Sequence, residues 1–279
     1  MKLPSSIRII DLAPDYPVLQ ISHPLCSGTV ALHGAHVMAW RPNDEEEVLY
    51  LSPQAVYTGG VPIRGGIPIC WPWFNAHPNN KELPSHGLVR NVFWQLKGAS
   101  ESKDGVTIKL SFRKDNWQAA LTIDMGKELV VSLQSYNPSN EKIKISGALH
   151  TYLNVGNIGQ IRIRGLEASN YLDTVGPPIV RKQEGSIMFQ NEVDRIYESS
   201  GITYLDDPVL KRTIVVEKSG SPSTVIWNPW KDKAAALKDL PDDAYLRFAC
   251  IETSISNQSA ISLNPADCHE ISTKIRVVH

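Results

Sequence analysis

The sequence predicts an all-β protein, a large antiparallel β-sandwich with little helix. Short runs rich in Val, Ile, Thr and aromatic residues recur along the chain, and Gly, Pro, Asn and Asp separate them at the close spacing typical of antiparallel strands. The 279 residues are 42% hydrophobic and 20% charged, which is enough apolar side chain to bury a sizeable core. Because all-β sandwiches often reach about 250 residues as one unit, we expect a single domain over residues 1–279.

Alternating apolar and polar residues predict a series of strands in the first half of the chain. Asp104-Gly105 and Gly126-Lys127 supply residues that tight hairpin turns between such strands require. The expected strands are residues 29–32, 36–41, 93–99, 106–113, 118–124, 129–136 and 142–149.

The alternating pattern resumes after the middle of the chain, together with one short helical pattern. No composition shift, Ser/Gly linker, long charge run or fixed-period repeat divides the sequence, which favours one continuous domain. The expected strands are residues 161–163, 213–217, 224–227, 245–252 and 270–278, and the expected helix is 233–240.

Charge and hydropathy exclude several classes of function. Lys and Arg number 28 against 29 Asp and Glu, so the protein has no global basic field to attract nucleic acid or anionic lipid. The N-terminus opens no apolar run of signal-peptide length, and the sequence contains no apolar run of the roughly eighteen residues that cross a membrane. We therefore expect a cytoplasmic protein without nucleic-acid or membrane partners, in which any recognition of an anion is local.

The cysteines and histidines predict no metal site. Cys26, Cys70, Cys250 and Cys268 lie far apart without a C-x-x-C pair, which suits reduced thiols in small core or near-core positions. No H-E-x-x-H or comparable spacing occurs, so a transition-metal site is not expected. The chain should fold without help from metals or disulfides.

Two arginines in glycine turns, close to aromatic residues, predict a phosphate site. Arg64 begins an R-G-G-I-P turn, the aromatic run W-P-W-F follows at 71–74, and Arg90 lies in the H-G-L-V-R-N turn that begins at His86. The planar guanidinium matches a phosphate bidentately, and glycine lets a ligand approach the backbone closely. The alternative is that each arginine pairs with a surface carboxylate in an ordinary loop.

Two further residues have the chemistry for proton transfer. His150 leaves a strand and enters a polar, glycine-bounded stretch, and Glu252 ends an otherwise apolar strand. Histidine titrates near neutral pH, and partial desolvation raises the pKa of a Glu so that it suits a general base. The alternatives are a structural histidine hydrogen-bonded at a strand end, and a salt bridge from Glu252 to Arg247 or to an arginine of another loop.

Two stretches contain residues suited to a sugar. Asp194 lies in V-D-R-I-Y at 193–197, and Trp227 and Trp230 enclose an Asn-Pro pair. A carboxylate accepts hydrogen bonds from vicinal hydroxyls, and an indole offers a flat apolar face to the C–H side of a pyranose. The alternatives are that Asp194 and Arg195 form only an ion pair, and that the tryptophans belong to the core.

Taken in order along the chain, these motifs resemble those of the hexose-6-phosphate mutarotases of the aldose 1-epimerase superfamily. The resemblance spans almost the whole chain and implies a galactose-mutarotase-like β-supersandwich, no required metal or cofactor, and a substrate such as glucose 6-phosphate. The motifs are R-G-G-I-P-I-C-W-P-W-F from Arg64, H-G-L-V-R-N from His86, H-T-Y-L from His150, D-R-I-Y from Asp194, W-N-P-W from Trp227 and C-I-E from Cys250.

The resemblance also implies a role for each candidate residue. By position in these motifs, His150 is the general acid, Glu252 the general base, Arg64 and Arg90 the phosphate ligands, Asp194 a ligand of sugar hydroxyls, and His86 a candidate substrate contact.

Two other functions are compatible with the same fold, since fold alone does not determine function. One is a non-catalytic carbohydrate-binding or sugar-sensing protein, and the presence of both His150 and Glu252 argues against it. The other is a mutarotase for unphosphorylated aldoses, and the two arginines argue against it because a neutral sugar gives them no charge to neutralise. We expect a monomer that acts on a small-molecule sugar phosphate.

Overall fold

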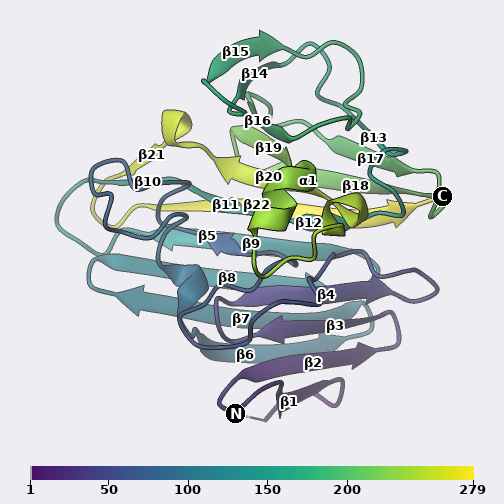
Figure 1. The fold of residues 1–279 in the computed structure, drawn as a ribbon. Helices are drawn as coiled ribbons and strands as arrows, with labels where there is room; N and C mark the ends of the chain where they lie inside the picture. The colour runs from purple at the N-terminus through teal and green to yellow at the C-terminus, as the bar shows by residue number, and fades with distance from the viewer. Residues whose placement is uncertain (1) are drawn as a thin grey trace.

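The computed structural model describes residues 2–279, and it confirms the predicted antiparallel β fold with little helix (Figure 1). Most strands belong to two eight-stranded sheets, which we call the long-stranded sheet and the short-stranded sheet. A four-stranded sheet at the N-terminal end and a two-stranded ribbon complete the arrangement.

The long-stranded sheet contains the most regular strands. Its order is β13 (Arg162–Arg164), β17 (Thr203–Asp207), β18 (Arg212–Ser219), β22 (Cys268–Val278), β9 (Leu129–Tyr136), β8 (Trp117–Met125), β7 (Gly105–Lys114) and β6 (Gln95–Ser102).

The short-stranded sheet has the order β15 (Ile179–Lys182), β14 (Asn170–Asp173), β16 (Val193–Tyr197), β19 (Ser223–Asn228), β20 (Phe248–Ile255), β11 (Gly147–Leu149) and β5 (Ile69–Cys70), and β12 (Tyr152–Asn154) also pairs with β20.

The remaining elements flank these two sheets. The four-stranded sheet runs β1 (Ile7–Asp11), β2 (Pro17–His23), β3 (Cys26–Ala31) and β4 (His36–Pro42), and the ribbon pairs β10 (Ile143–Ile145) with β21 (Ile261–Leu263). The helices are α1 (Trp230–Ala236) and the 3-10 turns Val89–Asn91, Ala244–Arg247 and Asn257–Ser259.

The inner strands β19, β20, β11 and β5 of the short-stranded sheet are buried on both faces, and this places polar residues in an apolar setting. Every residue of β20 is buried, and neighbours along it face opposite clusters. Ala249 and Ile251 join the main core, whereas Phe248 and Cys250 join a second cluster that includes Tyr152. Because side chains alternate along a strand, Glu252 faces the same side as the second cluster.

The strand predicted at 142–149 is in fact two strands of different sheets, so that prediction is wrong. β10 pairs with β21, whereas β11 pairs with β20 and β5, and Ser146 separates them. The N–H of Ser146 donates to Pro72 O, and its hydroxyl accepts from the Phe74 N–H. The chain changes sheets at Ser146, a step that alternation of side chains does not reveal.

The helix predicted at 233–240 lies at Trp230–Ala236 instead. Asn228 Oδ1 accepts from the Trp230 N–H at 2.9 Å and so favours an earlier start. Leu237 ends the helix because its backbone is extended, with φ −91° and ψ 108°.

Other departures from the sequence prediction are local. The strand predicted at 245–252 starts at Phe248, because Ala244–Arg247 forms a 3-10 turn, and it continues to Ile255. Glu252 therefore lies inside the strand, so the prediction that it ends the strand is wrong. Pattern reasoning did not find the strands β1, β2, β5, β12, β14 to β17 and β21. Cys26, Cys70 and Cys250 are buried as expected. Cys268 is exposed instead, because it is the first residue of β22, where it pairs with Tyr136, the last residue of β9.

No helix among residues 2–279 has both the length and the apolar character needed to cross a bilayer.

Candidate active site

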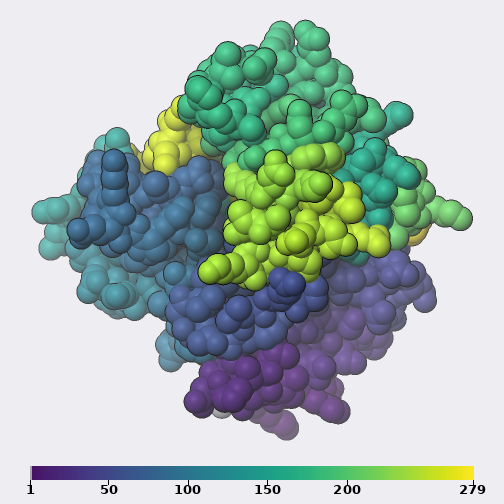
Figure 2. Space-filling view, in the orientation of Figure 1, coloured from purple at the N-terminus to yellow at the C-terminus, as the bar shows by residue number. Residues whose placement is uncertain are grey.

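A cavity of about 310 Å³ gathers all of the predicted site residues beside the short-stranded sheet. Figure 2 shows that segments far apart in the sequence meet on this face, where the blue chain that precedes β6 lies against the lime-green chain around α1. The lining residues are Arg64, His86, Arg90, His150, Asp194 and Glu252, together with Pro62, Ile63, Pro68, Phe74, Asn75, Tyr152, Val225, Trp227 and Lys233.

Strand pairing places His150 beside Glu252. Leu149 of β11 is opposite Thr253 of β20, so the next residue of one strand lies near the previous residue of the other. His150 Nδ1 is 3.3 Å from Glu252 Oε1, although the two atoms are not aligned as a hydrogen bond. The His150 ring stacks on Tyr152, with ring centres 4.8 Å apart and planes 11° apart. The pair is therefore both close and held in orientation.

Burial sets the electrostatics of this pair. Burial raises the pKa of Glu252 well above its usual range, and the charge of Asp194 adds to the effect. Burial lowers the pKa of His150 well below its usual value, and the neighbouring His86 together with the charges of Arg64 and Arg90 lowers it further. Glu252 is 1% exposed, and its Oε2 has no hydrogen-bond partner within residues 2–279. Before any ligand charge enters, the surroundings favour the uncharged form of each group.

The Arg64 turn requires its glycines because the backbone is tightly packed. Gly65 and Gly66 have φ of +102° and +62°, the left-handed region that glycine tolerates best. A Cβ on Gly65 would collide with the Tyr50 carbonyl oxygen, and one on Gly66 with the Val37 carbonyl oxygen. The turn therefore fixes the backbone from which the Arg64 side chain reaches the cavity.

Arg64 pairs with a carboxylate and also lines the cavity. Its Nε donates to Asp239 Oδ2 at 3.1 Å, and its Nη1 donates to the Tyr152 hydroxyl at 3.1 Å. The Arg64 side chain is 22% exposed. The carboxylate pairing considered as an alternative is thus present, yet it leaves the guanidinium at the cavity wall.

His86 and Arg90 lie side by side in the cavity wall with different charge states. The Asn75 N–H donates to His86 Nδ1 at 3.3 Å, so in the neutral ring Nε2 carries the proton. Burial, followed by the charges of Arg90 and Arg64, lowers the pKa of His86 to about 3. Arg90 donates from Nη2 to Ser85 O at 2.9 Å, while its buried Nε has no partner in the described chain. His86 is therefore a neutral donor next to a permanent cation.

Asp194 and Trp227 face each other on neighbouring strands of the cavity wall. Burial raises the pKa of Asp194, and Trp227 is 9% exposed. Lys233 of α1 also reaches the cavity, and it pairs with Glu192 at 2.7 Å. Among residues 2–279, no three His, Cys, Asp or Glu side chains are grouped as metal ligands.

The ion pairs considered as alternatives for Glu252 and Asp194 do not form with Arg247 or Arg195. Arg247 donates to Gly156 O at 2.9 Å rather than to Glu252. Arg195 donates to the Gln183 side chain at 3.3 Å and lies over the Tyr171 ring, so it does not pair with Asp194. Glu252 and Asp194 both line the cavity, and no arginine among residues 2–279 forms a salt bridge with either of them.

Sequence reasoning did not identify Tyr152, Asn75 and Lys233 as cavity residues. A signal for Tyr152 existed, because it lies two residues after His150 and side chains at i and i+2 share a face of an extended chain. Lys233 had no such signal, since it reaches the cavity from a helix whose start was misplaced.

The antiparallel sandwich places this chain in a class, the proteins with the galactose-mutarotase-like fold. Within that class, this chain belongs to the aldose 1-epimerase family, which matches residues 17–276.

Related proteins support this placement. The chain is 33% identical over 253 residues to a protein of Escherichia coli K12 named "Putative glucose-6-phosphate 1-epimerase", with 87% of this chain and 84% of that protein covered. A protein of Cenchrus ciliaris with the same name is 32% identical over 263 residues, covering 87% and 78%.

Solved structures agree with the fold. The crystal structure of a "putative mutarotase" from Salmonella typhimurium superposes with a TM-score of 0.89 and 29% identity over 98% of this chain and 97% of that one. A galactose mutarotase-like protein from Clostridium acetobutylicum superposes with a TM-score of 0.76 at 16% identity, covering 98% of each chain. At that identity the second likeness concerns the fold alone.

Proposed function

We propose that this protein interconverts the α and β anomers of a hexose 6-phosphate, with glucose 6-phosphate as the first substrate to test. One observation carries the proposal: His150 and Glu252 lie 3.3 Å apart in a cavity that Arg64 and Arg90 also line. The names of the relatives from E. coli and C. ciliaris point in the same direction.

The chemistry of anomer exchange requires an acid and a base that act close together. A proton leaves the C1 hydroxyl while another reaches the ring oxygen O5, and the C1–O5 bond then breaks to give the open aldehyde. The hydroxyl oxygen and O5 are both bonded to C1, so an acid and a base that lie next to each other can reach both oxygens. Glu252 as carboxylate takes the hydroxyl proton, and His150 as imidazolium protonates O5. Rotation about C1–C2 followed by the reverse transfers gives the other anomer and restores both residues.

The phosphate group has two effects in this proposal. Held by Arg64 and Arg90, it anchors the flexible open chain between the two steps. It also offsets the positive charges that lower the pKa of His150, because an anion near a histidine favours the imidazolium form. Binding of the substrate thereby favours the protonated acid that the reaction needs.

The remaining cavity residues suit the sugar ring. Asp194 is positioned to accept bonds from ring hydroxyls, and His86 to donate one from Nε2. Trp227 supplies an apolar face, and the three residues line the same cavity as the acid–base pair. Hydrogen bonds from fixed partners orient a ligand at little entropic cost.

A mutarotase for unphosphorylated aldoses is the second candidate, and one observation favours it. Asp239 already compensates the charge of Arg64 at 3.1 Å, so this arginine resembles a hydroxyl ligand more than a dedicated phosphate ligand. Arg90 favours the phosphosugar, since no carboxylate within residues 2–279 pairs with it.

NMR measurement of anomer exchange on glucose 6-phosphate, glucose and galactose separates these candidates. We expect exchange of glucose 6-phosphate well above the spontaneous rate and much weaker exchange of the two neutral sugars. Faster exchange of galactose or glucose would favour the second candidate. Binding without any exchange would identify a carbohydrate-binding protein instead.

We also propose that the protein acts as a monomer, as one domain, in the cytoplasm. All four cysteines are free thiols, which suits a reducing compartment.

A further inference from the structure

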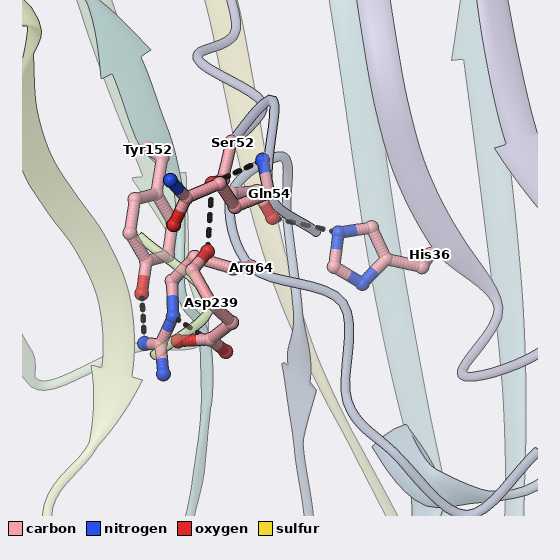
Figure 3. Close-up of polar contacts among 7 residues, drawn as sticks. His36, Ser52, Gln54, Arg64, Tyr152 and Asp239 are labelled. Carbon is pink, nitrogen blue, oxygen red and sulfur yellow. Dashed lines mark hydrogen bonds and ion pairs between the residues drawn. The ribbon is translucent and has the colours of Figure 1, made fainter. Parts of the chain in front are cut away.

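The guanidinium of Arg64 is held by side chains from two distant segments (Figure 3). Asp239, in the loop that follows α1, accepts from Nε at 3.1 Å, and Tyr152 of β12 accepts from Nη1 at 3.1 Å. Tyr152 lines the cavity, whereas Asp239 is not among the lining residues. These bonds use two of the five N–H groups of the guanidinium, and the others stay available to a ligand.

The backbone around this contact is anchored by Ser52. Its N–H donates to Arg64 O at 3.1 Å, and its hydroxyl donates to Asp239 O at 2.7 Å. Ser52 is 2% exposed, so both bonds are protected from water. One residue therefore ties the Arg64 turn to the Asp239 loop, as Figure 3 shows.

The other side of the turn is held as firmly. His36 Nε2 bonds to Gly65 O at 2.7 Å, and because a carbonyl only accepts, the ring nitrogen is the donor. Burial lowers the pKa of His36 to about 3, so the donor ring stays neutral. With the backbone fixed at Gly65 and Ser52, the direction of the Arg64 side chain depends on Asp239 and Tyr152.

We propose that Asp239 is a positioning residue, which orients the Arg64 guanidinium toward the phosphate of the substrate without touching the substrate itself. This inference rests on the proposed function. With Nε bound to Asp239 and one Nη1 hydrogen bound to Tyr152, the guanidinium is fixed in its plane, and the other Nη1 hydrogen and the Nη2 hydrogen on the edge away from Nε remain for the phosphate. The same guanidinium contacts Tyr152, whose ring stacks on His150. Asp239 thus sets the distance between Arg64, which binds the phosphate, and His150, the proposed acid.

The test compares Asp239→Ala and Asp239→Asn with the wild type and with Asp242→Ala. Asp242 is an exposed carboxylate of the same loop that makes no bond to Arg64, so its variant matches the change in net charge. We expect Asp239→Ala to raise KM for glucose 6-phosphate about tenfold, the scale of one charge-assisted hydrogen bond, with kcat and the use of glucose nearly unchanged. Asp239→Asn should recover most of the loss, because its amide oxygen still accepts from Nε. Asp242→Ala should behave as wild type.

The same change in an Arg64→Ala background shows whether Asp239 acts through Arg64. There, Asp239→Ala should raise KM no further. An unchanged or lower KM in the single variant, an equal loss for glucose, or a further loss without Arg64 would each overturn the inference.

Calorimetric binding of glucose 6-phosphate keeps the two proposals separate. A wild type that binds this sugar without exchanging it would overturn the proposed function, and the Kd values of the variants would still decide the role of Asp239. A wild type that does not bind it would overturn both.

Discussion

Strand β8 of the long-stranded sheet and strand β20 of the short-stranded sheet show opposite patterns of burial. In β8, Ala119, Leu121, Ile123 and Met125 are buried while the residues between them are half-buried or exposed. In β20 every residue is buried, Glu252 included. A strand such as β8, with one face exposed to solvent, adds its other face to the hydrophobic core. A strand such as β20, buried on both faces, can keep a carboxylate away from water. Desolvation of this kind is what shifts a pKa. We therefore expect the long-stranded sheet to contribute mainly to stability, and β20 to contribute to the proposed chemistry.

The largest expected effect comes from His150, the proposed general acid, which follows β11 of the short-stranded sheet. His150→Gln should lower the exchange rate by about a hundredfold to ten-thousandfold, the usual contribution of a general acid, with little change in melting temperature. The control is His269→Gln in β22, whose ring bonds to Gly220 O far from the cavity residues, and this variant should exchange anomers normally. Exchange close to the wild-type rate in folded His150→Gln would contradict the division of roles between the sheets.

The long-stranded sheet should respond in the opposite way. Leu121 is fully buried in the main core, and Leu121→Ala should lower the free energy of unfolding by about 2–5 kcal/mol while kcat stays near the wild-type value. The control is Thr122→Ala, a half-buried position on the other face of β8. Denaturant unfolding and anomer exchange on the same samples test this. A large fall in kcat with little loss of stability would show that this sheet also shapes the site.

Variants of Arg64 and Arg90 test whether the cavity beside the short-stranded sheet prefers a phosphorylated sugar. Arg64→Ala and Arg90→Ala should each lower kcat/KM for glucose 6-phosphate by about tenfold to a hundredfold, the equivalent of one charge-assisted hydrogen bond. Use of free glucose should barely change. Lysine should restore only part of the loss, because it replaces the charge and not the planar fork. If both sugars lose equally, the arginines have a structural role.

The smallest expected effect is a displacement of the pH profile. The reactive state has Glu252 ionised and His150 protonated, so the pair carries one proton in total. Burial raises the pKa of Glu252, and burial together with nearby positive charges lowers the pKa of His150. Activity therefore falls on the acid side where the pair gains a second proton, and on the alkaline side where it loses its last one. The two limbs belong to the coupled pair.

Bound phosphate should move the alkaline limb to higher pH, because it offsets those positive charges. The profile of kcat, which describes the complex, should therefore extend further on the alkaline side than that of kcat/KM, which describes the free enzyme. Glucose should show no such difference. Identical alkaline limbs with glucose 6-phosphate, or a flat profile, would leave the acid–base pair without support.

The same contrast explains what the sequence could predict. Strand 129–136 matches β9 exactly, and 118–124 lies within β8, because one face of each strand is wet and the side chains alternate. Hairpin turns are present close to both predicted places: Lys103-Asp104 joins β6 to β7, so Gly105 already belongs to β7, and residues 126–128 join β8 to β9. In the short-stranded sheet, strands such as β5 and β12 are very short and mostly apolar on both faces. Alternation of apolar and polar residues therefore gives little indication of where these strands lie.

The cavity residues were recognised through motifs rather than through periodicity. His150 and Glu252 were found because chemistry-bearing residues in otherwise apolar stretches are unusual. Two residues were not found: Lys233, which lines the cavity from α1, and Asp239, which bonds to Arg64 from the loop after α1. Their positions depend on how α1 and this loop pack against the rest of the chain. Contacts between distant segments of this kind follow from tertiary packing, which local sequence does not specify.

The central claim is that Glu252 transfers a proton rather than holding the fold or the substrate. Glu252→Gln keeps the shape of the side chain and removes the base, so the decisive measurement is anomer exchange of glucose 6-phosphate by this variant, with its Kd measured on the same preparation. The account predicts a Kd close to the wild-type value and an exchange rate lowered by about a hundredfold or more. Near-wild-type exchange by the folded variant would contradict it.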